Sequence, residues 1–399
     1  MEASKLYTPE LFQFVQDHLS EDPAQLLLRH KVSGALDVKE AAVQIAARQK
    51  SRRKLPQWIA NPSVIFPPTV SLEQCSSEET AIFKRRFVDG ERLLDLTGGF
   101  GVDSYYLGEG FAEVTYVERQ EKLAGIARHN FSALGKHSSQ YKVVCGDAID
   151  FLTSVNGQVD WAYLDPARRG EGNQKLYKLS DCEPDIVENW ELLTRKAQNI
   201  MVKASPMLDI KEALRELPAL SEVHVVAVKN EVKELLLIWR SGEKGSRDIT
   251  AWDLPAKASF AFSLEKEEVE KSSFSLPDNY LVLPSAAILK AGAFKSFGNH
   301  YQLKKLHPHT HLYTTSELAE STGILGRIFE IQEEVKMDKK TLRKLFPSGQ
   351  VNVITRNYTM KPDIIKKKFR LKDGGEDYLV ACTVQDGSPK AFWCKRFSR

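Results

Sequence analysis

Residues 93–103 constrain the fold of this chain more than any other segment. They read Leu-Leu-Asp-Leu-Thr-Gly-Gly-Phe-Gly-Val-Asp: an apolar run that carries Asp95, a glycine-rich turn, and the start of an amphipathic segment. A strand followed by a turn without bulky side chains lets a ligand lie against bare backbone. The stretch therefore predicts a strand–turn–helix unit of an α/β fold with a ligand site at the turn.

The positions of the acidic residues narrow the choice of ligand. NAD-type loops place their glycines at G-x-G-x-x-G and need a carboxylate only at the end of the next strand. Here Asp95 precedes the glycines, and Glu118 ends the next apolar run, residues 114–118. A carboxylate beside the loop suits a ligand with a positive centre and an amino group, such as S-adenosylmethionine. The alternative is an ordinary strand–turn–helix unit of another α/β protein.

Length and composition bound the class of protein. A chain of 399 residues predicts two or three domains, and 42% hydrophobic with 27% charged residues is ordinary for a globular protein. No apolar run approaches the length of a membrane span, and residues 1–5 form no apolar signal core, so we expect no membrane partner. The five cysteines are scattered, without C-x-x-C spacing, which favours the cytoplasm and argues against a zinc site.

Charge is spread unevenly along the chain. Residues 336–399 hold 16 lysines and arginines against six acidic residues, a net charge of +10, whereas the whole chain has +3. A basic terminal module on a mildly acidic body is typical of nucleic-acid binding. The alternative is a solvated lysine-rich face.

Hydrophobic patterning divides the chain into four regions, 1–79, 80–243, 244–335 and 336–399. The first predicts helices and a proline-rich linker. The second predicts strands near 92–97, 113–118, 141–145, 159–165 and 198–203 with helices between them, hence a doubly wound parallel sheet. Two β-rich runs, 223–228 and 234–239, predict a closing hairpin with an antiparallel strand. The last two regions predict mixed α+β structure.

Four predicted strands of the second region each end in, or are followed by, an acidic residue: Asp95, Glu118, Asp147 and Asp165. Glu118 can accept hydrogen bonds from ribose hydroxyls. Asp147 can accept from the adenine amine, although it also suits a helix N-cap. Asp165-Pro166 follows the fourth strand and projects over the ligand crevice. The predicted cofactor-binding residues are Asp95, Thr97, Gly98, Gly99, Gly101, Glu118, Asp147 and Asp165.

These motifs resemble the Rossmann-like, S-adenosylmethionine-dependent methyltransferases over about residues 80–240. The whole chain resembles a bacterial family assigned as RNA methyltransferases, in which a ferredoxin-like domain and a THUMP-like domain follow the catalytic domain. Residues 283–294 and 304–313 carry the resemblance to the ferredoxin-like part, and residues 355–358 and 371–375 carry it to the THUMP-like part. The resemblance implies a seven-stranded catalytic domain at 80–243, a ferredoxin-like domain at 244–335 and a basic THUMP-like domain at 336–399. It also implies structured RNA, ribosomal or transfer, as the substrate.

The motif after the fourth strand departs from the pattern of nucleobase amino-methyltransferases, which carry (Asp/Asn)-Pro-Pro-(Tyr/Phe). Ala167 and Arg168 occupy the last two positions, and an arginine can stack on a base or pair with phosphate. A cysteine nucleophile for pyrimidine C5 chemistry is missing after the fifth strand, where Lys203-Ala-Ser205-Pro stands. The predicted catalytic residues are Asp165, Pro166 and Arg168. The predicted substrate-binding or RNA-binding residues are Arg169, Lys203, Ser205, Lys366, Lys367, Lys368 and Arg370.

The sequence also allows two rival functions. Thr97, in place of a first glycine, and the missing aromatic residue after Asp165-Pro166 suggest an RNA-binding protein whose methyltransferase domain is weak or inactive. A methyltransferase that acts on a small molecule or a protein is the other rival. The run that contains His307, His309 and His311 could present three imidazoles, but we expect a packed turn or surface contact and no metal.

Overall fold

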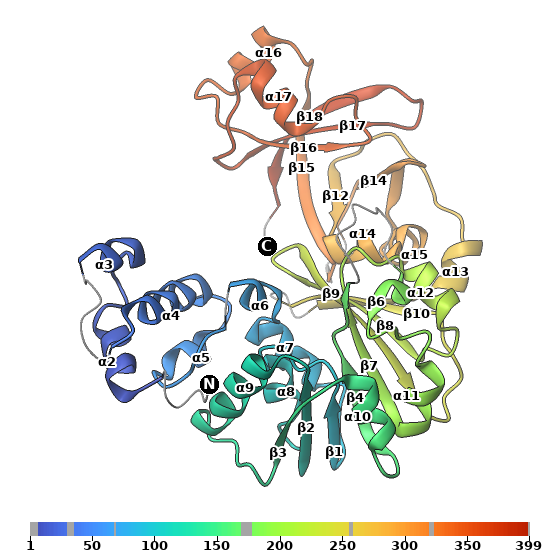
Figure 1. The fold of residues 1–399 in the computed structure, drawn as a ribbon. Coiled ribbons are helices and arrows are strands. Elements are labelled where there is room, and N and C mark those ends of the chain that lie inside the picture. The colour runs from blue at the N-terminus through green and yellow to red at the C-terminus, as the bar shows by residue number, and fades with distance from the viewer. Residues whose placement is uncertain are drawn as a thin grey trace. The chain divides into compact units, whose positions relative to one another are not determined.

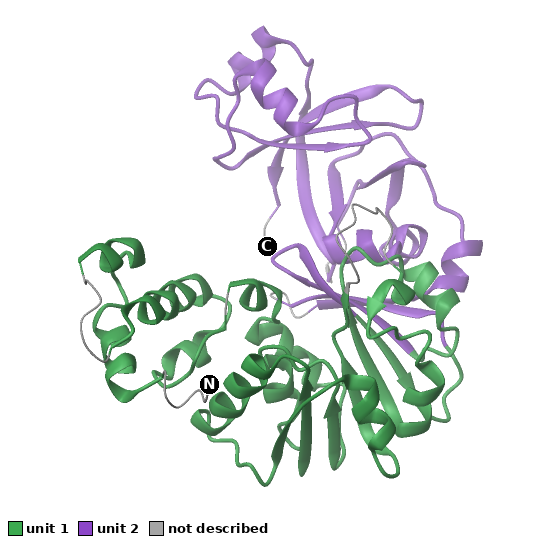
Figure 2. Cartoon of the chain, viewed as in Figure 1, with its two compact units in different colours: residues 1–221, 236–245 green, residues 222–235, 246–399 purple. Residues whose placement is uncertain are grey.

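The computed structural model describes residues 7–29, 36–67, 69–168, 178–254, 258–318 and 323–397. The chain forms two compact units (Figure 2). Unit 1 comprises residues 1–221 and 236–245, and unit 2 comprises residues 222–235 and 246–399. Within the described ranges, no helix combines the length and apolar character that a bilayer crossing demands.

Unit 1 begins with helices whose starts follow from local capping. Thr8 accepts a hydrogen bond from the N–H of Leu11 and precedes Pro9, and Asp37 accepts one from the N–H of Glu40. The helices are α2 Pro9–Asp17, α3 Pro23–Arg29, α4 Val38–Ser51, α5 Pro56–Ala60, α6 Thr69–Gln74 and α7 Glu78–Arg85 (Figure 1).

Buried polar contacts attach these helices to the rest of unit 1. The Arg48 guanidinium is buried and donates to the carbonyls of residues 59, 61, 62 and 64. Asn130 exchanges two hydrogen bonds of 2.8 Å with the backbone of Ile65. Apolar side chains of the N-terminal helices share one core with Phe100, Val102 and Ile126. The N-terminal region is therefore part of the same packed body as the glycine loop.

Strands and helices then alternate as the sequence predicts (Figure 1). The elements are β1 Arg92–Asp95, α8 Val102–Leu107, β2 Glu113–Glu118, α9 Glu121–Ala133, β3 Tyr141–Cys145, α10 Ala148–Ser154, β4 Val159–Leu164, β5 Ala167–Arg168, η1 Leu179–Asp181, β6 Cys182–Glu183, α11 Trp190–Lys196, β7 Ala197–Ala204 and α12 Ile210–Glu216. β1 pairs in parallel with β2 and β4, β2 with β3, and β4 with β7. The carboxyl ends of these strands therefore meet at one edge of the sheet.

The sheet order confirms the predicted fold class. Seven strands follow the order β3-β2-β1-β4-β7-β9-β8, and β10 and β11 extend the sheet to nine. β8 Glu222–Val228 and β9 Glu231–Arg240 flank a two-residue turn at Lys229 and Asn230, both with positive φ, as a hairpin turn of this length requires. The division between the two units falls within β9, between residues 235 and 236. β10 Asp248–Asp253 pairs in parallel with β8 and antiparallel with β11 Ala258–Ser263.

The rest of unit 2 forms a second sheet of seven strands in the order β13-β14-β12-β15-β18-β17-β16. The strands are β12 Tyr280–Pro284, β13 Lys304–His307, β14 Thr310–Thr315, β15 Gly326–Glu334, β16 Asn352–Arg356, β17 Asp377–Thr383 and β18 Pro389–Arg396. The helices of unit 2 are α13 Leu264–Val269, α14 Ala286–Ala291, α15 Phe294–His300, α16 Lys339–Leu345 and α17 Pro362–Phe369. One sheet thus joins the regions predicted to be ferredoxin-like and THUMP-like, and the predicted domain boundaries stay predictions.

Candidate active site

A cavity of about 210 Å³ lies in unit 1 at the carboxyl edge of the parallel strands. Its lining includes all four carboxylates that the sequence predicts around one ligand: Asp95, Glu118, Asp147 and Asp165. Each follows or ends a different parallel strand, so the sheet itself brings residues 70 positions apart to one edge.

The glycine loop has its shape because of what packs behind it. A Cβ on Gly98 would lie 2.1 Å from the buried ring of Tyr116, so only glycine fits there. Gly99 and Gly101 have positive φ values of 54° and 87°, and a Cβ on Gly99 would meet no atom closer than 3.8 Å. The backbone of this loop therefore faces open space in the cavity.

Asp95 lies beneath the loop and is buried. Its carboxylate accepts hydrogen bonds from the Thr97 N–H at 2.9 Å and from the Ser104 hydroxyl. Burial raises the pKa of Asp95 to about 7, and the charges of Asp103 and Asp165 add to this, whereas the two hydrogen bonds oppose it. A cationic group in the cavity would therefore favour the ionised form of this carboxyl.

Glu118 and Asp147 are oriented by backbone donors. Glu118 accepts hydrogen bonds from the N–H groups of Gly99 at 2.9 Å and Gln120 at 2.8 Å. Asp147 is the N-cap of α10 and accepts from Ile149 and Asp150. Each carboxylate keeps free lone pairs toward the cavity, which suits a ligand that carries hydroxyl and amino donors.

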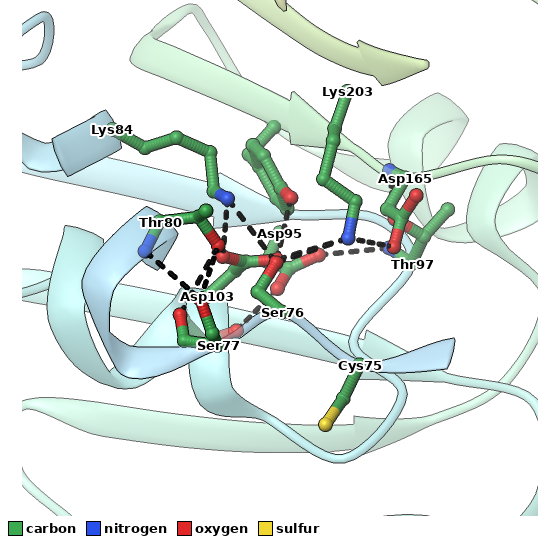
Figure 3. Close-up of polar contacts among 12 residues, drawn as sticks. Cys75, Ser76, Ser77, Thr80, Lys84, Asp95, Thr97, Asp103, Asp165 and Lys203 are labelled. Carbon is green, nitrogen blue, oxygen red and sulfur yellow. Dashed lines mark hydrogen bonds and ion pairs between the residues drawn. The ribbon is translucent and has the colours of Figure 1, made fainter. Parts of the chain in front are cut away.

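Asp165 meets a buried group of charges (Figure 3). Its Oδ2 atom lies 2.6 Å from Nζ of Lys203, and its N–H donates a 2.5 Å hydrogen bond to the Thr97 hydroxyl. Burial raises the pKa of Asp165, and the Lys203 ammonium opposes that shift. Thr97 therefore ties the glycine loop to the end of β4, a structural task that a glycine at this position would not perform.

Other predicted residues lie at or after the ends of β4 and β7. Lys203 is buried at the end of β7, and Ser205 forms the turn after it, with its hydroxyl accepting from the N–H of Met207. Pro166 follows Asp165 but is not among the residues that line the cavity. Arg169 and the side chain of Arg168 lie outside the described residues. β5, which includes Arg168, pairs with β6, and Glu183 and Pro184 add to the cavity wall.

Several residues of this site carry no motif and were missed by sequence reasoning. Ser71, Gln74, Cys75 and Ser76 of the N-terminal region line the cavity. Asp103, two residues after the last loop glycine, accepts hydrogen bonds of 2.7 Å from the hydroxyls of Ser76 and Tyr163 and pairs with two lysines. Only Asp103 had a signal in the sequence, because it lies within the glycine-rich stretch itself.

The predicted RNA-binding residues on α17 and at its C-terminal cap, Arg370, lie in unit 2. Lys367, Lys368 and Arg370 are exposed, whereas Lys366 pairs with Asp363 at 3.0 Å and Asp373 at 2.8 Å. The histidine run lies on β13, β14 and their turn, where the His311 ring stacks on Phe294 with centroids 3.6 Å apart. Among the residues that the structure describes, no group of three or more His, Cys, Asp or Glu side chains is arranged to hold a metal ion.

A solved structure decides the family. The crystal structure of a "putative methyltransferase" from Porphyromonas gingivalis W83 matches with a TM-score of 0.88 and 30% identity over the full length of both chains. The chain belongs to this methyltransferase family. Two family models also match this chain. A ferredoxin-like domain matches residues 280–321, and a THUMP domain-like model matches residues 326–396.

Two curated relatives of this chain are also named as methyltransferases. An uncharacterized S-adenosylmethionine-dependent methyltransferase of Mycobacterium tuberculosis is 24% identical over 325 residues, which cover 80% of this chain and 84% of the relative. The ribosomal RNA small subunit methyltransferase J of Brucella anthropi is 24% identical over 157 residues, which cover 34% of this chain and 76% of that enzyme.

Proposed function

We propose that this enzyme transfers a methyl group from S-adenosylmethionine to a nucleobase of structured RNA, ribosomal or transfer, in the cytoplasm. The observation that carries the proposal is the convergence of Asp95, Glu118, Asp147 and Asp165 on one cavity beside the glycine loop. When bound, the cofactor supplies a methyl group on a sulfonium, which is already activated for transfer. The protein then needs mainly to align the attacking atom.

The donor and acceptor chemistry of the cavity fits this cofactor. Asp95 would attract the amino group of the methionine part, and Glu118 would accept from the ribose hydroxyls. Asp147 would accept from the adenine amine. The open side of the loop at Gly99 leaves room for a ligand against the backbone. The cofactor-binding roles of Thr97, Gly98 and Gly101 are then to shape this loop.

Asp165 would act on the substrate. Its partly exposed carboxylate can accept a hydrogen bond, and then the proton, from the attacking atom of the base. Pro166 stiffens the turn that follows, and Arg168 and Arg169 would hold base or phosphate. A target base within a stem would have to leave the stack to reach this carboxylate.

Three features support RNA as the substrate. The THUMP domain-like match covers the basic C-terminal region, which has a net charge of +10 from residue 336 onward. α17 presents Lys367 and Lys368 to solvent, and Arg370, which follows the helix, is also exposed. One relative is named as a ribosomal RNA methyltransferase. A small-molecule or protein substrate would give no reason for this basic module.

The test is to incubate the protein with labelled S-adenosylmethionine and total RNA from a strain that lacks it. We expect label in one RNA species and one modified nucleotide, located by mass spectrometry. Calorimetry on the same preparation should give a micromolar-range cofactor constant. Cofactor binding without labelled RNA would favour a small-molecule or protein substrate, and RNA binding without cofactor binding would favour an inactive methyltransferase domain.

A further inference from the structure

Four charged side chains form an alternating row within unit 1 (Figure 3). Nζ of Lys84 lies 3.1 Å from Oδ1 of Asp103, and Nζ of Lys203 lies 3.4 Å from Oδ2 of the same carboxylate. The Lys203 ammonium also lies 2.6 Å from Asp165. The exposed fractions of the side chains are 0% for Lys84, 10% for Asp103, 9% for Lys203 and 36% for Asp165, so the row runs from the interior to the cavity.

Two hydroxyl groups complete the hydrogen bonding of this row. The Ser76 hydroxyl donates to Asp103 at 2.7 Å and accepts from Lys84 and Lys203, each at 3.1 Å. A hydroxyl has one proton and two lone pairs, so these three contacts use all its capacity. Tyr163 donates to the same Asp103 oxygen at 2.7 Å. Burial alone would raise the pKa of Asp103, but the two ammonium groups and these hydroxyls lower it well below its usual range.

Stability alone gives little reason for such a row. Buried ion pairs seldom stabilise a fold more than apolar side chains of similar volume would, because each charge loses its hydration. Two ammonium groups balance two carboxylates here; both carboxylates line the cavity, and Asp165 is the more exposed of the two, at 36% against 10% for Asp103. The arrangement therefore places one fixed positive charge, that of Lys203, directly behind the carboxylate that faces the substrate.

The N-terminal region supplies part of this arrangement. Ser76 follows α6 and Lys84 lies on α7, and both precede the parallel sheet in the chain. The Lys54 ammonium donates to the carbonyls of Leu72 and Glu73 at 2.9 and 2.8 Å, which fixes the end of α6. The segment that carries Ser76 is thus held in place from two sides.

We propose that Lys84, Asp103 and Ser76 are positioning residues that hold the Lys203 ammonium against Asp165 and keep the Asp165 carboxylate ionised while it orients the attacking atom. This inference rests on the proposed role of Asp165. It assigns Lys203 a position behind the acid rather than contact with RNA, and it makes the N-terminal region a component of the active site.

The charges around Asp165 fix the sign of the effect. Lys203 and, at longer range, Lys84 lower its pKa, whereas Asp103 and burial raise it. Removing Lys203 leaves the carboxylate without its contact partner. Removing Lys84 leaves Asp103 with Lys203 as its remaining ammonium, which draws that ammonium away from Asp165. Both changes should therefore raise the pKa of Asp165.

The test follows the titration of Asp165 in the full-length protein by NMR of ¹³C-labelled aspartate, with the resonance assigned by its absence in Asp165→Asn. We expect the Asp165 pKa to rise by about one to three pH units in Lys203→Met, since an adjacent opposite charge shifts a carboxyl by that amount. Lys84→Met and Ser76→Ala should give smaller rises, and Lys203→Arg should restore the wild-type value. Lys136→Met, which removes a largely buried lysine 3.8 Å from Glu109, is the matched control and should leave the Asp165 pKa unchanged.

Wild-type titration of Asp165 in Lys84→Met and Ser76→Ala would overturn the inference, and Ser76→Ala decides the matter if Lys84→Met does not fold. Activity separates this inference from the proposed function. If the Asp165 pKa moves as expected and the acidic limb of the kcat profile moves with it, both stand. If the NMR titration moves while the kcat profile does not, the row positions Lys203 as proposed but Asp165 does not orient the attacking atom.

Discussion

The backbone N–H of Gly99 donates a 2.9 Å hydrogen bond to Oε2 of Glu118, which joins the glycine loop to the end of β2. Tyr116, two residues before Glu118, donates from its hydroxyl to the Gly99 carbonyl at 2.6 Å. The other Glu118 oxygen accepts from Gln120. The acid proposed to hold the ribose is therefore fixed in place by the same loop that it faces.

Replacing Glu118 with glutamine should weaken S-adenosylmethionine binding about ten- to a hundredfold, the cost of losing one or two hydrogen bonds to a charged group. The amide would also turn a donor toward a backbone N–H. Calorimetry measures the constant. Glu121→Gln, which changes an exposed acid in the first turn of α9, is the control and should bind like wild type. Equal affinities for the two variants would show that Glu118 does not contact the ligand.

Cofactor binding should depend on pH through Asp95. Its pKa of about 7 means that much of this carboxyl is protonated below pH 7 in the free protein. An ammonium ligand favours the ionised form, so binding releases a proton in this range, and affinity should fall about tenfold for each pH unit below the pKa. We expect the dissociation constant to rise about tenfold from pH 7.5 to pH 6.

The ligand's own amino group also titrates, so the comparison needs Asp95→Asn. This variant should bind weakly at every pH and should lack the acidic loss of affinity. Calorimetry in buffers of different ionisation enthalpy counts the released proton directly. A wild-type constant that is flat between pH 6 and pH 7.5 would contradict the role given to Asp95.

Gly98→Ala should destabilise the fold by about 1–3 kcal/mol, because its Cβ would lie 2.1 Å from the Tyr116 ring and force a shift in a packed region. Tyr116 is fully buried and cannot move aside freely. Urea unfolding followed by circular dichroism measures the change. Gly125→Ala in α9 is the matched control: its Cβ meets no atom within 4 Å, and it should stabilise by about 0.5–1 kcal/mol. An unchanged free energy of unfolding in Gly98→Ala would mean that the Tyr116 ring can move aside without cost.

The strand ends were predictable because chemistry and periodicity coincide there. Asp95, Glu118, Asp147 and Asp165 each follow a short apolar run, and parallel strands bring such positions to one edge. The hairpin after the fifth strand was equally readable, since two β-rich runs flank Lys229-Asn230. These signals are local in sequence, and the sheet converts them into a site.

Long-range contacts could not be read in this way. Ser76 and Lys84 reach Asp103 because α7, which begins just after Ser76 and carries Lys84, packs against α8, and no motif encodes that packing. α14 and α15 are separate helices because Gly292, between them, takes a left-handed conformation with φ of 79°. Burial of a lysine is likewise a tertiary property, so the sequence could not show that Lys203 is buried at the end of β7.

The basic helix α17 offers a final test on RNA. Lys367 and Lys368 are exposed, whereas the charge of Lys366 is already balanced by Asp363 and Asp373. If the exposed pair contacts phosphates, Lys367→Ala with Lys368→Ala should reduce the slope of log affinity against log salt by about 1.5, and Lys366→Ala should change it less. Filter binding between about 50 and 200 mM salt measures both slopes. Equal slopes for wild type and the double variant would remove α17 from the RNA contact and leave other basic residues of the C-terminal region to explain any affinity.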